Sequence, residues 1–138
     1  MKYLLDTSVI SELIASQPNP NVVEFVDSLD QEDIYLSTIT VGEVAKAIQK
    51  QPDPARKQSL QKWLYQDLLV RFDGRVISLD ANIMIRWGQL SAKVESIGIE
   101  FPAIDAMIAA IVLTHEMVLV TMYENDFKDT EIEVVNPW

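Results

Sequence analysis

Four carboxylates stand where the hydrophobic pattern of the chain predicts that a strand gives way to a turn or a helix. They are Asp6 in YLLDTSV, Glu43 in STITVGEV, Asp105 in FPAIDAMIAA and Asp126 in LVTMYENDF. Carboxylates delivered to equivalent edges of a parallel sheet meet in space, and they repel one another unless a divalent cation lies between them. The four acids therefore indicate a metal-dependent enzyme.

The segments that must position these acids alternate between strand and helix patterns. Short apolar strands are expected at 1–5, 34–37, 75–79, 117–120 and 132–135. Helical spacing of apolar residues is expected at 8–14, 22–29, 40–48, 55–72, 83–97 and 104–115. This alternation predicts the α/β class, as a three-layer α/β/α domain around a central, mostly parallel five-stranded sheet. Ligands of such sheets collect beyond the carboxyl ends of the strands, which is where the acids are expected.

Length and composition predict one soluble domain that spans residues 1–138. The chain has 138 residues, of which 49% are hydrophobic, and no apolar run is long enough to cross a bilayer. The opening MKYLLDT is too short for a signal peptide, and the absence of cysteine excludes disulfides and thiolate chemistry and fits a reducing interior. We expect a cytoplasmic protein.

The net charge of −10 ordinarily argues against a polyanionic partner, because most nucleic-acid-binding proteins carry a basic surface. Divalent ions bound by several of the acids would reverse the local field that a phosphate meets. The same charge also suits a basic protein partner.

Each acid also has a purely structural interpretation. Asp6 precedes Thr7-Ser8 at a helix start, where it would cap the helix or complement its dipole; Thr7 and Ser8 are the other candidates for the cap. Glu43 and Thr40 match the capping box S/T-x-x-E, in which the glutamate binds the amide of the first residue.

The two later acids differ in how strongly the sequence indicates that they belong to a functional site. Asp105 leads a very apolar helix with no basic residue near it in sequence, so it is the most suggestive of the four. Asp126 lies in YENDFKD and has the pattern of a turn residue. Its neighbours Glu124 and Asp129 are equally good candidates on charge alone.

Five blocks of the chain together resemble one family. They are LLDTSVISEL, STITVGEVAKAI, FPAIDAMIAAIVLTH, LVTMYENDF and the closing VVNPW, so the likeness runs nearly end to end. They resemble the PIN-domain ribonucleases, and among these the VapC/FitB type of toxin from bacterial type II toxin–antitoxin systems.

The resemblance implies that Asp6, Glu43, Asp105 and Asp126 are both the catalytic residues and the ligands of Mg²⁺ or Mn²⁺. All-oxygen ligation is what these ions prefer. It further implies an endoribonuclease that cleaves single-stranded or loop RNA with a metal-activated water. Thr7 and Thr121 match hydroxyl positions of the family and are expected to position the substrate.

The chain departs from the family pattern beside Thr121. Where the family has Thr-Arg-Asn, this chain has Thr121-Met122-Tyr123, which removes a cation and an amide. Loss of an arginine that binds phosphate would weaken substrate binding or stabilisation of the transition state. The alternative function is therefore a catalytically impaired PIN domain that acts as an antitoxin-binding module.

The remaining expectations concern partners and a different fold. The resemblance implies a VapB-like antitoxin, whose peptide lies across apolar surfaces between helices, and a homodimer. His115 is expected to interact with a helix dipole rather than to act as a base. A phosphoacceptor receiver domain with Asp80 as acceptor is a third interpretation, but it requires paired acids after the first strand and a late lysine. The chain has Asp6-Thr7 and Thr121-Met122 instead.

Overall fold

A five-stranded sheet with strand order β3-β2-β1-β4-β5 forms the centre of the fold, and every pairing in it is parallel. The computed structural model describes residues 1–138. The strands are β1 Tyr3–Leu5, β2 Ile34–Ser37, β3 Val76–Ile77, β4 Val118–Val120 and β5 Glu133–Val135. The expected three-layer α/β/α architecture is confirmed, with a sheet that is entirely rather than mostly parallel.

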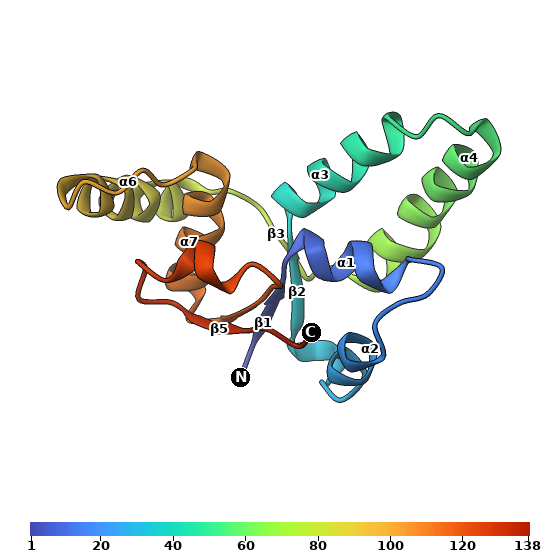
Figure 1. Ribbon diagram of the computed structural model, residues 1–138, viewed down its shortest axis with the longest axis horizontal. Helices are drawn as coiled ribbons and strands as arrows, with labels where there is room; N and C mark the ends of the chain where they lie inside the picture. Colours follow the sequence, from blue (N-terminus) through green and yellow to red (C-terminus); the bar gives the residue numbers. More distant parts are fainter.

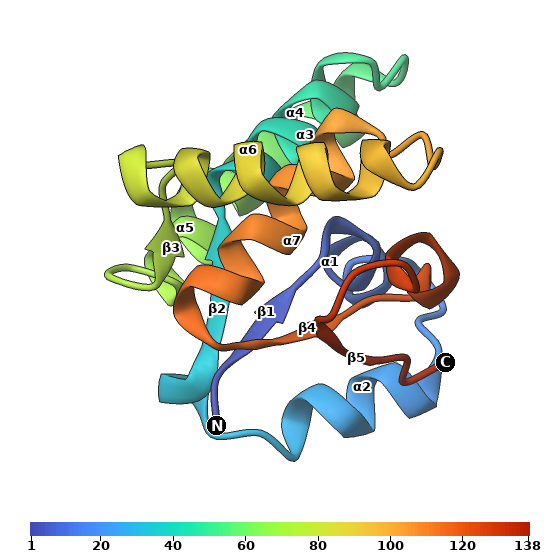
Figure 2. The same ribbon diagram turned by 90° about the vertical axis from the view of Figure 1, so that its left-hand side faces the viewer.

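Helices cover both faces of this sheet (Figures 1 and 2). The α-helices are α1 Thr7–Leu13, α2 Pro20–Asp27, α3 Thr38–Gln49, α4 Pro54–Trp63, α5 Leu69–Arg71, α6 Ala81–Ser96 and α7 Ala103–His115. The shorter helical segments are η1 Gln31–Asp33, the π-helical η2 Leu64–Leu68 and η3 Glu124–Phe127. No helix is both long and apolar enough to cross a bilayer.

The core is divided in two by the sheet because successive strand residues face opposite sides. On β1, Leu5 packs with α1, α2, α3 and η2, whereas Leu4 packs with α6 and α7. On β4, Val120 and Leu119 divide in the same way. The uniformly apolar stretch Ile108 to Val112 of α7 is buried against the second face, as its composition predicts.

Several expected element boundaries are wrong. The backbone of Asp6, not Thr7 or Ser8, is the N-cap of α1. Helix α3 begins at Thr38 rather than Thr40, because the hydroxyl of Ser37 accepts a hydrogen bond from the Thr40 amide and caps the helix. The expected continuous helix at 55–72 changes to π-helical pitch in η2, and the strand expected at 75–79 is only two residues long. Ile97, expected on the buried stripe of α6, is exposed.

Candidate active site

The four expected acids line one cavity of about 570 Å³ beyond the carboxyl ends of the central strands. Asp6 directly follows β1, Glu43 lies on α3, Asp105 lies in the first turn of α7 and Asp126 lies on η3. Of the three acids at 124, 126 and 129, only Asp126 lines this cavity. We refer to this space as the central cavity.

The central cavity carries a concentrated negative charge that no basic side chain balances. A fifth acid, Glu12, lines it together with the four expected acids, and none of its lining residues is lysine, arginine or histidine. Sequence reasoning missed Glu12. The sequence does contain a pattern that indicates Glu12. Ser8, Ser11 and Glu12 have the spacing i, i+3, i+4, which puts all three on one face of α1, and all three line the cavity.

The carboxylate of Asp6 is fixed through one of its two oxygens. Its Oδ2 accepts hydrogen bonds from the hydroxyls of Thr121 at 2.8 Å and Ser8 at 3.0 Å. Its Oδ1 accepts no hydrogen bond from the chain. The two hydroxyls therefore orient the carboxylate and leave one oxygen available to another ligand.

Thr121 itself is completely buried and does not line the central cavity. Its hydroxyl also accepts a hydrogen bond of 3.1 Å from the backbone amide of Tyr123. Thr121 therefore joins Asp6 to the loop that follows β4, and it holds Asp6 in place rather than facing a substrate. The amide of Met122 lies 3.3 Å from the hydroxyl of Ser8 and adds a second link to the same loop.

The carboxylate of Glu43 is held in a similar manner by Thr7. The Thr7 hydroxyl donates to Glu43 Oε1 at 2.6 Å and lies 3.0 Å from the hydroxyl of Thr40. Glu43 makes no hydrogen bond to the amide of Thr40, which binds Ser37 instead. The capping-box interpretation of Glu43 is therefore wrong, and its second oxygen is left without a donor from the chain.

Burial raises the pKa of Asp105 above its usual range, and the negative charges of Asp126, Asp6 and Glu43 raise it further, in that order. A position in the first turn of a helix would by itself favour the ionised form. The upward shift of the pKa means that burial and the three neighbouring carboxylates outweigh the helix dipole. Asp105 also accepts no hydrogen bond from a side chain and has no ion-pair partner.

The acids surround the cavity without converging on a point. No group of three or more Asp, Glu or His side chains is arranged to hold a metal ion as the side chains stand. Thr7 holds Glu43 through one oxygen, whereas Asp126 is exposed and makes no side-chain hydrogen bond, so the carboxylate of Asp126 can turn toward the cavity. The donor set itself, composed of carboxylates and hydroxyls, suits Mg²⁺ or Mn²⁺.

The residues that replace the Arg-Asn pair of the family lie at the edge of the central cavity. Met122 and Tyr123 both line it, with 41% and 54% of their surfaces exposed. No basic side chain from another element occupies the place of the missing arginine in the cavity. The phosphoacceptor interpretation of Asp80, which the sequence already disfavours, has no support in the structure either, because the Asp80 carboxylate accepts a hydrogen bond from the Ile83 amide and caps α6.

Comparison with known proteins agrees with this fold. Residues 3–133 match the model of the PIN domain family. The chain is 38% identical to the plasmid stability protein StbB of Pseudomonas syringae and 36% identical to the toxin FitB of Neisseria gonorrhoeae. Each match covers 98% of this chain and 97% of the relative. The VapC ribonuclease Y4jK of Sinorhizobium fredii is 30% identical and is covered to 96% of its length.

The solved structures agree closely in three dimensions. The crystal structure of FitAcB from Neisseria gonorrhoeae superimposes with a TM-score of 0.94 at 36% identity, over 99% of this chain and 98% of the other. A structure of FitAB bound to a DNA fragment has a TM-score of 0.93 at the same identity. The chain therefore belongs to the PIN-domain family, in the group of toxins that includes FitB and the VapC proteins.

Proposed function

We propose that residues 1–138 form a single PIN domain that acts as a Mg²⁺- or Mn²⁺-dependent endoribonuclease toxin. The observation that carries this proposal is the central cavity, which five acids line and in which no basic side chain is present. Burial raises the pKa of Asp105 there, and the negative charges of Asp126, Asp6 and Glu43 raise it further, so the carboxylates also repel one another. A divalent cation is the ligand that relieves this repulsion.

The fixed carboxylates support this assignment. Asp6 and Glu43 each direct one oxygen toward hydroxyl donors of the chain, and each keeps the other oxygen without a donor. Hydroxyls that orient a metal-binding carboxylate are typical of such sites. We expect Asp126 to turn inward when an ion binds.

A divalent ion bound there supplies the positive charge that activates water and stabilises a phosphodiester during hydrolysis. The chain contributes orientation: Thr121 and Ser8 hold Asp6, and Thr7 holds Glu43. No histidine or lysine lines the cavity, so the carboxylates are its only proton acceptors at neutral pH. The exposed ring of Tyr123 is available to stack on a base.

Single-stranded or loop RNA is the proposed substrate. The support comes from relatives, since Y4jK of Sinorhizobium fredii is named a VapC ribonuclease. The charge of −10 does not oppose this substrate once an ion is bound, because the ion reverses the field at the cavity.

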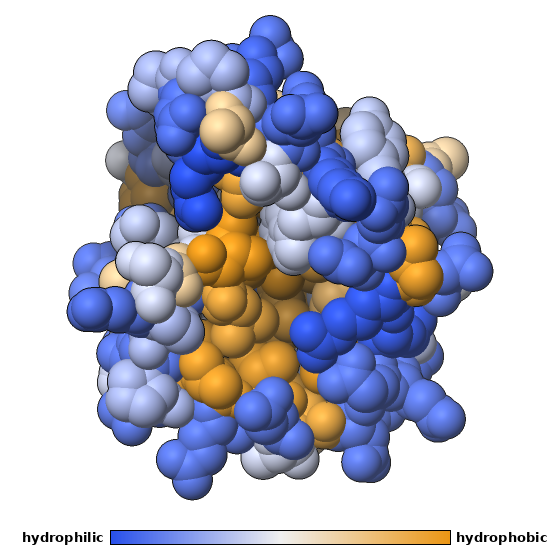
Figure 3. Space-filling view, turned by 90° about the vertical axis from the view of Figure 1, so that its right-hand side faces the viewer, coloured by the Kyte–Doolittle hydropathy of each residue, from blue (hydrophilic) through white to orange (hydrophobic).

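The proposed protein partner is a VapB-like antitoxin. A narrow cavity of about 170 Å³ lies between α1 and the segment from α4 to α5, and its apolar lining includes Leu13, Trp63 and Leu68. Figure 3 shows an apolar, hollowed area on this face of the molecule. Apolar side chains of a partner peptide would be buried in such a groove. A homodimer, which the family resemblance implies, stays a prediction.

A second candidate function follows from the edge of the central cavity. Met122 and Tyr123 stand where the family pattern has Arg-Asn, and no basic side chain lines the cavity. This observation favours a catalytically impaired domain that only binds an antitoxin.

The test of the proposed function is cleavage of an RNA pool by the purified chain with Mg²⁺, with Mn²⁺ and with EDTA. We expect cleavage by the wild type that requires a divalent ion and is lost in Asp6→Asn and Asp105→Asn. Circular dichroism establishes that both variants remain folded. Cleavage by both variants at the wild-type rate would exclude the site, and cleavage in EDTA would exclude the metal.

A further inference from the structure

Two grooves open from the central cavity on different sides. The first, of about 670 Å³, shares Thr7, Glu43 and Ile104 with the central cavity. The second, of about 500 Å³, shares Asp105 and Asp126 with it. We name them the α3 groove and the η3 groove. They have no lining residue in common, so the central cavity connects them.

Lysines line both grooves but not the cavity between them. Lys46 and Lys50 line the α3 groove, and Lys128 lines the η3 groove, where it lies among the acids Glu100, Asp105, Asp126 and Asp129. Lys46 lies on α3, and Lys50 is its C-cap residue with helical backbone angles. The two lysines are four residues apart, so they lie on one face of the helix, and both are exposed. In Figure 1, α3 and α7 lie on opposite sides of the sheet.

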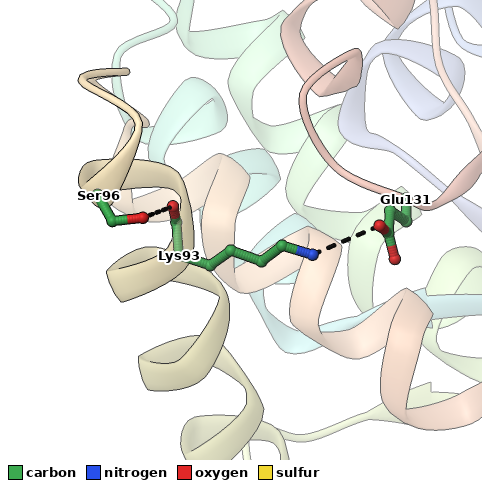
Figure 4. Close-up of polar contacts among 3 residues, drawn as sticks. All are labelled: Lys93, Ser96 and Glu131. Atoms are coloured by element: carbon green, nitrogen blue, oxygen red, sulfur yellow. Dashed lines mark hydrogen bonds and ion pairs between the residues drawn. The ribbon is translucent and has the colours of Figure 1, made fainter.

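No carboxylate neutralises these three lysines. The structure contains one ion pair, between Lys93 and Glu131 at 3.4 Å, which Figure 4 shows between α6 and the loop after η3. Lys46, Lys50 and Lys128 therefore have no acid within ion-pair distance, although the chain carries a net charge of −10. The α3 groove has two lysines and one acid, Glu43, so it offers net positive charge to an anionic ligand, whereas acids outnumber Lys128 in the η3 groove.

The α3 groove also offers apolar surface opposite its lysines. Leu79, Ile104 and Met107 line it, and Leu79 and Ile104 are 36% and 46% exposed. Apolar side chains beside a row of cations suit a strand whose bases are unpaired, because a duplex keeps the faces of its bases covered.

We propose that a single strand of RNA enters the central cavity along the α3 groove. Lys46 and Lys50 bind phosphates on this side of the cleaved bond. This assignment rests on the proposed function, since it takes the central cavity as the place of cleavage. It names two residues that position the substrate at a distance from the reacting phosphate.

The test measures binding rather than cleavage. Fluorescence anisotropy records the affinity of a short, fluorescein-labelled single-stranded RNA of mixed sequence for the wild-type protein at a series of salt concentrations. Ca²⁺ replaces Mg²⁺ as the ion bound by the carboxylates, and gel electrophoresis establishes that the RNA stays intact during the measurement. With Lys46→Gln and Lys50→Gln introduced together, we expect roughly tenfold weaker binding and a salt-dependence slope reduced by about 1.4, because each lost phosphate contact removes about 0.7. Lys128→Gln should leave the slope unchanged, because acids outnumber the single cation in the η3 groove.

The matched control is Arg56→Gln with Lys62→Gln. These residues are also exposed, lie on α4 and line none of the three spaces, so the pair removes the same net charge elsewhere. We expect less than about a twofold change in affinity from it. Equal weakening by the control and the Lys46/Lys50 pair would overturn the proposal, as would unchanged binding in the Lys46/Lys50 variant or no RNA binding by the wild type. The proposed function fails separately, when wild-type protein with Mg²⁺ leaves RNA intact.

Discussion

The hydroxyl of Thr121 donates a 2.8 Å hydrogen bond to Oδ2 of Asp6, across a sequence separation of 115 residues. Thr121 is fully buried directly after β4, and Asp6 directly follows β1. The two strands are neighbours in the sheet, so their ends bring the residues together. The position of the Asp6 carboxylate therefore depends on the loop after β4, which also leads to Asp126.

Replacing Thr121 by valine tests this dependence. Thr121→Val keeps the shape of the side chain but leaves Asp6 with one donor and the Tyr123 amide without its acceptor. We expect a loss of about 1–3 kcal/mol in the free energy of unfolding and a fall in RNA cleavage. Urea denaturation measures the first and a cleavage assay the second. Thr121→Ser keeps the hydroxyl and should retain cleavage. Equal cleavage by the valine variant and the wild type would contradict the role of Thr121 in holding the Asp6 carboxylate.

Thr7 should act on ion binding through Glu43. Thr7→Val removes the 2.6 Å hydrogen bond that orients the Glu43 carboxylate, whereas Thr7→Ser keeps the donor. We expect the affinity for Mn²⁺ to fall roughly 10- to 100-fold in the valine variant, the usual cost of losing a group that orients a metal ligand. Isothermal titration calorimetry measures this affinity. Indistinguishable Mn²⁺ affinities for the valine and serine variants would show that Thr7 is only structural.

Asp105 should make the stability of the metal-free protein depend on pH. Because its pKa is raised in the folded state, the stability that its protonated form contributes is fully present below the ordinary carboxyl pKa of about 3.9. That contribution is lost as the pH rises through the raised pKa of the folded state. At neutral pH the ionised carboxylate therefore destabilises the fold.

Asp105→Asn removes this cost. In EDTA at neutral pH the variant should melt a few degrees above the wild type, and the difference should shrink as the pH falls toward the ordinary carboxyl pKa. Added Mg²⁺ should raise the melting temperature of the wild type more than that of the variant. Thermal unfolding followed by circular dichroism gives all three comparisons. A variant less stable than the wild type in EDTA at neutral pH would show that the carboxylate is not under repulsion.

Restoring the family residues distinguishes an active enzyme from a binding module. We expect the wild type to cleave RNA and Met122→Arg with Tyr123→Asn to cleave roughly tenfold faster at low substrate concentration, because an arginine there would bind phosphate. Met122→Gln with Tyr123→Asn lacks the cation and serves as the control in the same cleavage assay. An inactive wild type beside an active arginine variant would favour the module.

The fold was predictable from local patterns to a large extent. Strand β2 was predicted with its observed bounds. Gly98 follows the end of α6 and has a positive φ of 78°, as expected of a glycine that ends a helix. The errors arose where one residue serves two elements or where helical pitch changes. Ser37 is both the last residue of β2 and the cap of α3, and the π-helical segment η2 leaves no distinct mark in the apolar spacing.

The candidate site was predictable in its acids but not in what holds them. Strand ends and helix starts brought Asp6 and Asp105 to the central cavity as the topology predicts. The buried contact of Thr121 with Asp6 and that of Thr7 with Glu43 join distant segments, and no local pattern encodes them. The spacing of residues along α1 indicated Glu12 locally, although the hydrogen bond that Glu12 accepts from Trp138 is a tertiary feature.

Binding of Mn²⁺, followed by electron paramagnetic resonance of the free ion, tests the central claim most directly. Glu12→Gln is the matched control: Glu12 lines the same cavity, and glutamine keeps an oxygen for the 2.9 Å hydrogen bond from Trp138 Nε1. We predict that the wild type and Glu12→Gln bind Mn²⁺ with affinities within about threefold, while Asp6→Asn and Asp105→Asn lose binding. Absence of Mn²⁺ binding by the wild type, or equal binding by all four proteins, would contradict the account.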